Sequence, residues 1–194
     1  MQHHTPNRTG HKRPLPRVII LTGEKGVGKS SIVRAALARV KCKIGGFFTV
    51  PVETSAQRVG YELLDLQTGE KRIFARRVPG SHAPRGGPFV VDQEVFNSFG
   101  TQVIERARQS ADIVVMDEIG CMEQGALVFQ EAIRGCLRSG IPVLCVVQLG
   151  GCSFVRDLLA TYPGDVLQVS FAEQERICSA ALAKLKQWGV RVHE

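Results

Sequence analysis

Short apolar runs and stretches of helical periodicity alternate along most of the chain. Runs with almost no polar position are typical of strands buried on both faces of a parallel sheet, and helices usually join such strands. The alternation therefore predicts an α/β fold with a mostly parallel sheet. The predicted strands are residues 18–21, 44–50, 112–117, 141–147 and 165–169, and the predicted helices are residues 29–40, 92–109, 124–138, 154–160 and 172–188.

One region interrupts this alternation. Residues 59–66 and 71–75 flank a short polar turn, which predicts a β-hairpin inserted next to the glycine-rich loop described below. Pro51 lacks a backbone N–H, so we expect it to end the strand before it. Residues 79–88 hold three prolines and three glycines and are predicted to form a mobile loop. Asp92 is placed to cap the helix that follows it.

The clearest chemical signal joins the first predicted strand to the first predicted helix. Gly23-x-x-x-x-Gly28-Lys29-Ser30 matches the phosphate-binding loop, in the strand–loop–helix context that this motif requires. Glycines let backbone N–H groups point at phosphate oxygens, and the helix N-terminus adds partial positive charge. Lys29 is predicted to reach the β- and γ-phosphates, and the Ser30 hydroxyl is predicted to ligate Mg²⁺.

Two carboxylates lie at the end of a later apolar strand, about 90 residues after the glycine-rich loop, which is typical of a Walker B element. In open parallel sheets, ligands bind at this carboxyl edge. Asp117 is predicted to hold Mg²⁺, directly or through a water, and Glu118 to polarise the water that attacks the γ-phosphate. The alternative role for Glu118 is a helix cap or an ion pair. Glu123 is either a rival base or a residue that favours the next helix N-terminus.

Four arginines are candidates for neutralising charge on the transferring phosphoryl group, namely Arg58, Arg77, Arg85 and Arg176. For each of them the alternative is an ordinary surface arginine. The chain contains no Asn-Lys-x-Asp motif, which reads guanine in regulatory GTPases. The nucleobase is therefore left unassigned.

Composition narrows the class of protein. A chain of 194 residues with 44% hydrophobic residues is expected to form one soluble domain with a substantial core. No apolar run approaches the roughly 20 residues that span a bilayer, so we expect no membrane segment. Six cysteines without a C-x-x-C pair indicate reduced core thiols in a cytoplasmic protein rather than a metal site.

The net charge of +7 is unevenly distributed. Residues 1–16 are basic and almost free of apolar side chains, which predicts a disordered leader before a domain of residues 17–194. Residues 71–91 hold five basic residues and no acid. A nucleic-acid-binding protein usually spreads its charge over one face, so this distribution argues against a nucleic-acid partner. The second cluster is suited instead to attracting an anionic substrate such as a nucleotide.

A family resemblance rests on three segments: the glycine-rich loop, residues 46–49 (Gly-Phe-Phe-Thr) and residues 117–123 (Asp-Glu-Ile-Gly-Cys-Met-Glu). With these segments the chain resembles the P-loop nucleoside-triphosphatase family, which includes thermophile enzymes and the cancer-related nucleoside-triphosphatase. The similarity covers residues 17 to about 185, and Arg58, Gly60 and Tyr61 fall where the family has Arg, Gly and Phe. It implies a RecA-like, three-layer fold and Mg²⁺-dependent hydrolysis of ATP, GTP and other nucleoside triphosphates to diphosphate and phosphate. On this match the nucleotide-binding residues are Gly23, Glu24, Lys25, Gly26, Val27, Gly28, Lys29, Ser30 and Ser31, and the metal and water-activating residues are Asp117 and Glu118.

Two departures from the family pattern keep other functions open. The family continues Glu-Glu-Val-Arg where this chain has residues 50–53 (Val-Pro-Val-Glu), and it often has Asn-Arg where this chain has Glu175-Arg176. One alternative is a nucleotide or small-molecule kinase, although the paired acids argue against it because a kinase gains nothing from activating water. The other is a nucleotide-dependent switch or assembly factor whose hydrolysis depends on a protein partner.

Overall fold

The computed structural model describes residues 16–55, 57–78, 89–150 and 152–193. Nearly all of the predicted leader and the whole predicted loop of residues 79–88, with Arg85, lie outside these ranges.

The described residues form one eight-stranded sheet in the order β5-β4-β3-β2-β6-β7-β1-β8. The five strands from β2 to β8 in this order run parallel, and β3, β4 and β5 continue the sheet antiparallel beyond β2. The strands are β1 (Val18–Thr22), β2 (Ile44–Glu53), β3 (Arg58–Asp65), β4 (Lys71–Arg77), β5 (Phe89–Val91), β6 (Ile113–Ile119), β7 (Val143–Val147) and β8 (Asp165–Gln168).

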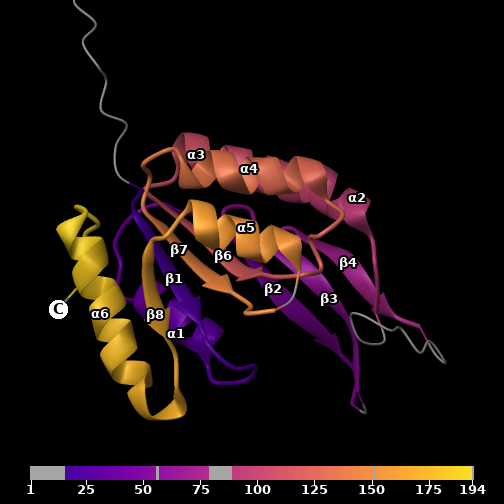
Figure 1. Ribbon diagram of the computed structural model, residues 1–194, viewed down its shortest axis with the longest axis horizontal. Coiled ribbons are helices and arrows are strands. Elements are labelled where there is room, and N and C mark those ends of the chain that lie inside the picture. The colour runs from indigo at the N-terminus through magenta and orange to yellow at the C-terminus, as the bar shows by residue number, and fades with distance from the viewer. Residues whose placement is uncertain (1–15, 56, 79–88, 151, 194) are drawn as a thin grey trace, which may run out of the picture.

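Helices cover both faces of the sheet and make a three-layer structure (Figure 1). On one face lie α3 (Thr101–Ser110), α4 (Leu127–Leu137) and α5 (Ser153–Thr161), and on the other lie α1 (Lys29–Leu37) and α6 (Gln174–Gln187). The short helix α2 (Gln93–Val95) and a π-helical turn (Phe96–Gly100) lead into α3, and a 3₁₀ turn (Phe171–Glu173) leads into α6. Among the helices of the described ranges, none is both long enough and apolar enough to span a bilayer.

Each face of the sheet has its own apolar core. Along β1 the side chains alternate, so that Val18 and Ile20 join one core while Ile19 and Leu21 join the other. This is why the strand reads as a continuous apolar run. The core on the α3–α4–α5 side contains an aromatic cluster, in which the ring of Phe129 lies 5.2 Å from that of Phe96 and 5.6 Å from that of Phe47.

The predicted alternation and the mostly parallel sheet are confirmed, and so is the hairpin, formed by β3 and β4. The prediction that Pro51 ends its strand is wrong. β2 continues to Glu53, because it leaves β6 after Phe48 and from there pairs with β3 alone, where Pro51 lies opposite Tyr61. A proline is tolerated where one edge of a strand needs no N–H donor.

Two further details differ from the pattern-based prediction. The predicted helix of residues 92–109 is continuous but contains the π-helical turn, and the Asp92 side chain caps its start by accepting a hydrogen bond from the Glu94 N–H at 3.0 Å. The three-residue strand β5 was not predicted, because so short a segment carries no recognisable period.

Candidate active site

The glycine-rich loop of residues 23–28 connects β1 to α1 at the carboxyl edge of the sheet. Gly23 and Gly28 have φ angles of 145° and 90°, which other residues rarely adopt. A Cβ atom at Gly23 would lie 2.6 Å from the carbonyl oxygen of Val169, and one at Gly28 would lie 2.6 Å from the Gln174 side-chain nitrogen. Both glycines are therefore required by conformation, and Gly23 is also required by space, because it faces a backbone oxygen whereas the end of the Gln174 side chain can move.

Lys29 is the first residue of α1, and its side chain folds back over the loop. Its ammonium group donates hydrogen bonds to the carbonyl oxygens of Gly23 at 3.0 Å and Glu24 at 2.7 Å. The side chain is buried, so these contacts hold a positive charge at a defined place inside the loop.

Ser30 and Asp117 are brought together by the fold, although 87 positions separate them in the chain. The Ser30 hydroxyl donates a hydrogen bond of 3.0 Å to one carboxyl oxygen of Asp117, and the other oxygen is buried without a partner among the described residues. Burial raises the pKa of Asp117 to about 6, and the hydrogen bond from Ser30 partly offsets this. An unpartnered carboxyl oxygen beside a hydroxyl is a natural place for a hard cation.

The chemistry of these donors fits Mg²⁺. The cation prefers oxygen ligands, and it usually binds one or two protein groups together with water and substrate phosphates. Within the described ranges, no group of three or more His, Cys, Asp or Glu side chains is arranged to hold a metal. Ser30 and Asp117 would therefore supply the protein's share of the ligands, and a bound phosphate would supply the rest.

Glu118 borders two neighbouring cavities at this edge of the sheet. The cavity over the glycine-rich loop has a volume of about 250 Å³, and a second one of about 80 Å³ extends toward the hairpin. Burial raises the pKa of Glu118, and the positive charges of Lys29 and Lys25 partly oppose the rise. The larger cavity is lined by Gly23, Glu24, Lys25, Lys29, Glu118, Gln148, Leu149 and Gln168.

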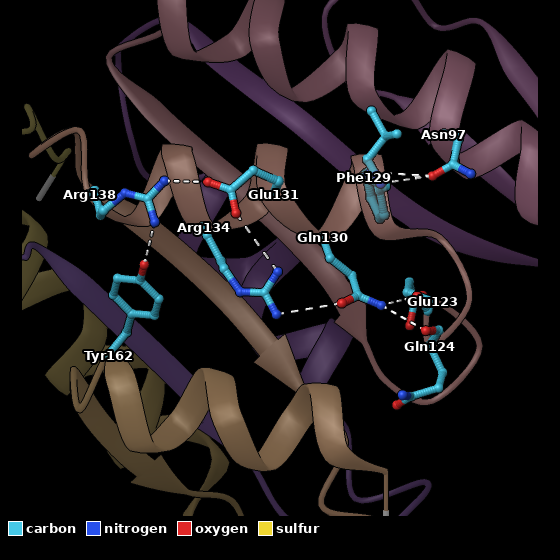
Figure 2. A network of polar contacts seen from close by, with 10 residues as sticks. Asn97, Glu123, Gln124, Phe129, Gln130, Glu131, Arg134, Arg138 and Tyr162 are labelled. Atoms are coloured by element: carbon cyan, nitrogen blue, oxygen red, sulfur yellow. Dashed lines mark hydrogen bonds and ion pairs between the residues drawn. The ribbon is translucent and has the colours of Figure 1, made fainter.

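Glu123 lies in the same region but is buried, with 2% of its surface exposed. Its carboxylate accepts a hydrogen bond of 2.9 Å from the Gly120 N–H, so it shapes the loop that follows β6. Helix α4 supports this loop (Figure 2). The Gln130 amide points from the helix and donates hydrogen bonds to the carbonyl oxygens of Glu123 and Gln124. The Arg134 guanidinium in turn approaches the Gln130 side-chain oxygen at 3.5 Å.

A sequence model described as NTPase matches residues 18–182. The chain belongs to the NTPase family. The nucleoside-triphosphatase THEP1 of Methanocaldococcus jannaschii is 28% identical over 170 residues, which cover 86% of this chain and 96% of that protein.

Two solved structures share the family fold at 24% sequence identity. The crystal structure of THEP1 from Aquifex aeolicus aligns with a TM-score of 0.74, covering 87% of this chain and 99% of that one. The solution structure of a human cancer-related nucleoside triphosphatase aligns with a TM-score of 0.71, covering 88% and 98%. The predicted family and the RecA-like P-loop fold are confirmed.

Three of the four candidate arginines, Arg58, Arg77 and Arg176, lie in the described ranges. Arg58 is bound to Glu53 at 2.8 Å and to the Tyr61 hydroxyl at 3.2 Å, and the Arg77 guanidinium donates to the Arg58 carbonyl at 3.5 Å. Arg176 is 70% exposed and pairs with Glu173 at 2.5 Å. None of these three lines either cavity, and each is engaged by a protein group in this structure.

The remaining residues of the predicted nucleotide-binding segment differ in their setting. Gly26 and Ser31 are exposed, and Val27 is buried with its carbonyl oxygen accepting a hydrogen bond of 2.8 Å from the Gln174 side chain. Gln174 is the first residue of α6, and it braces the glycine-rich loop from 147 positions away. No local pattern points to this contact, so sequence reasoning missed it.

Gln148 is a second residue that sequence reasoning missed. It follows β7, which lies between β1 and β6, and it lines both cavities. The sequence did carry a signal for Gln148, because it is a polar residue at the carboxyl end of a predicted parallel strand, and such residues meet at the ligand-binding edge. Tyr61 and Phe74 of the hairpin also line the smaller cavity. The hairpin therefore approaches the glycine-rich loop across this cavity, although three strands separate it from β1 in the sheet.

Glu123→Gln is expected to flatten the pH dependence of stability in this NTPase. Burial raises the pKa of Glu123 from 4.5 to about 7. As the pH rises through this window, the unfolded chain loses a proton that the folded protein still holds, so the free energy of unfolding falls by up to about 3 kcal/mol. Urea denaturation at pH 5, 6, 7 and 8 measures the fall, which should be smaller in the variant.

The residual slope in the Glu123→Gln variant belongs to the other buried acids, such as Asp117. The exposed Glu94 is the matched control, and Glu94→Gln should retain the parental slope. Equal slopes for Glu123→Gln and the parent would mean that Glu123 does not carry the pH dependence.

Proposed function

We propose that the protein hydrolyses nucleoside 5′-triphosphates, ATP and GTP among them, to diphosphate and phosphate, with Mg²⁺ as its cofactor. One observation carries the proposal. The fold brings Asp117 into hydrogen-bond contact with Ser30 at the start of α1, and Glu118 borders the same cavity as Lys29. Membership of the NTPase family and the names of the relatives support the same activity.

In this proposal the glycine-rich loop and Lys29 bind the triphosphate. The backbone N–H groups of the loop and the N-terminus of α1 attract phosphate oxygens. The Lys29 ammonium exchanges the carbonyl oxygens of Gly23 and Glu24 for the β- and γ-phosphates, where it neutralises the charge that builds up as the bond breaks. Gln174 keeps the loop in this shape through its hydrogen bond to Val27.

Glu118 orients the attacking water and takes its proton. A carboxylate whose pKa is raised is a stronger base than an exposed one, and burial raises the pKa of Glu118. Asp117 and Ser30 hold the cofactor, and bound Mg²⁺ supplies Lewis-acid neutralisation of the phosphate oxygens. The water oxygen bonds to the γ-phosphorus as its proton passes to the Glu118 carboxylate, the bond from the γ-phosphorus to the diphosphate oxygen breaks, and phosphate is released.

The smaller cavity favours one second candidate, a kinase. Tyr61, Phe74 and Met122 give it apolar walls directly beyond Glu118, where a small acceptor would replace the attacking water. The six free cysteines support the cytoplasm as the compartment of either enzyme.

Phosphate release by the purified protein with Mg²⁺ and each of ATP, GTP, CTP and UTP tests the proposed function. We expect release with several bases. Lys29→Ala should lower it by about 100-fold or more, because it removes the charge that binds the transferring group. Nucleotide binding without release, in the absence of any acceptor, would contradict the hydrolase and favour the kinase or a switch that needs a protein partner.

A further inference from the structure

Lys25 borders both cavities of the candidate active site. Its side chain belongs to the glycine-rich loop, between Gly23 and Gly26, and is exposed. Glu118 and Gln148 are the only other residues that line both cavities in the described part of the chain, so these three side chains mark the place where the cavities adjoin. Lys25 is also the one basic residue among the described residues that line the smaller cavity.

The two lysines of this region are held differently. The Lys29 ammonium is buried and donates to two backbone carbonyl oxygens, which fix its position. Lys25 forms no hydrogen bond or ion pair with another residue of the described ranges, so it can turn toward an anion with no protein contact to break first. Burial raises the pKa of Glu118, and the charges of Lys29 and Lys25 oppose the rise, so both ammonium groups act on that carboxylate.

The place where the cavities adjoin is where hydrolysis needs positive charge. In the proposed function, the loop holds the triphosphate in the larger cavity, and Glu118 orients the attacking water at the border with the smaller one. As the bond to the diphosphate breaks, negative charge spreads over the γ-phosphoryl oxygens. A cation that meets these oxygens as the charge develops stabilises the transition state more than the bound substrate.

The candidate arginines of the described ranges do not supply this charge. Arg58 and Arg176 are paired with acids, and Arg77 donates to a backbone carbonyl oxygen. None of the three lines either cavity, and Arg85 lies outside the described ranges. Besides Lys29, Lys25 is therefore the only basic side chain among the described residues that line the cavities.

We propose that the Lys25 ammonium contacts the γ-phosphoryl oxygens in the transition state and neutralises the charge that develops there. This role rests on the proposed function and adds to it a second catalytic lysine from the same chain. The water oxygen bonds to the γ-phosphorus, its proton passes to Glu118, and the electron pair of the breaking bond stays on the diphosphate oxygen. Lys25 donates hydrogen bonds throughout and keeps its own protons.

Lys25→Met removes the charge and keeps most of the length of the side chain. We expect kcat for nucleoside triphosphates to fall by about 100-fold, the usual cost of one lost donor to developing charge. KM and the affinity for a non-hydrolysable analogue should stay close to the parental values, because the contact forms in the transition state. Lys25→Arg retains the charge and should recover most of the rate. Lys186→Met is the matched control, since Lys186 is exposed on α6 and lines neither cavity, and it should hydrolyse as the parent does.

Binding of ADP with Mg²⁺ and aluminium fluoride, which imitates the transferring phosphoryl group, gives a readout that needs no turnover. The parent should bind ADP more tightly with aluminium fluoride than without it. Lys25→Met should lose most of this gain, while its affinity for ADP alone stays unchanged. A lysine that only shapes the loop would change both affinities together.

Any of four results would overturn the proposal: a parental kcat in Lys25→Met, a change confined to KM, a full aluminium fluoride gain in Lys25→Met, or no such gain in the parent. Loss of the gain in Arg85→Ala, with the gain kept in Lys25→Met, would assign the charge to Arg85 instead. A parent that binds nucleotide but releases no phosphate contradicts the proposed function, and the aluminium fluoride measurement then decides the role of Lys25 by itself.

Discussion

Glu118→Gln is expected to lower the turnover of nucleoside triphosphates by about 100- to 10,000-fold, the usual contribution of a general base. Gln has the size of Glu but cannot accept the proton of the attacking water. Lys29 and the glycine-rich loop are untouched, so the affinity for nucleotide should stay close to the parental value. Phosphate release under saturating substrate measures the turnover, and equilibrium binding of a non-hydrolysable analogue measures the affinity.

Glu123→Gln is the comparison that decides between the two glutamates. Glu123 also lines the smaller cavity, but its carboxylate is buried and bound to the Gly120 N–H. Its substitution should cost much less turnover than that of Glu118. Parental hydrolysis by Glu118→Gln, or a greater loss from Glu123→Gln, would transfer the role of base away from Glu118.

Phe129→Ala is expected to reduce the free energy of unfolding by about 3–5 kcal/mol. The ring is fully buried between those of Phe47 and Phe96, and it also fills the space above Gly100. Truncation leaves a cavity between β2, α4 and the π-helical turn, which close-packed neighbours can fill only in part. Urea denaturation followed by circular dichroism measures the loss.

Phe171→Ala is the matched control for this substitution, because 73% of the Phe171 surface is exposed. Its effect should stay within about 0.5 kcal/mol. A loss in Phe129→Ala no larger than that in Phe171→Ala would show that the aromatic cluster is not a main source of stability.

Much of the candidate site can be read from local patterns. Gly23 and Gly28 are required by backbone conformation, and the order of strand, loop and helix around them follows from a change of apolar period over a few residues. The same reasoning places Asp117 and Glu118, because a carboxylate at the end of a buried strand lies at the ligand-binding edge of any parallel sheet. Such features depend on residues that are close in the chain, so they can be predicted from the sequence.

The roles of the arginines cannot be predicted from local sequence patterns. Arg58 and Arg176 have the right chemistry for a phosphate, yet each is held by an acid on the surface, Glu53 and Glu173 respectively. A surface ion pair leaves no pattern that distinguishes it from a catalytic contact. Only the direction of the side chain decides between the two roles.

The sequence by itself determined the α/β class, the glycine-rich loop, the paired carboxylates and the family. The tertiary structure alone decided that β7 lies between β1 and β6, which brings Gln148 to the site, and that Gln174 braces Val27. Local conformation follows from the preferences of adjacent residues, whereas these contacts depend on which strands pair and which loops then meet, and packing of the whole chain sets both.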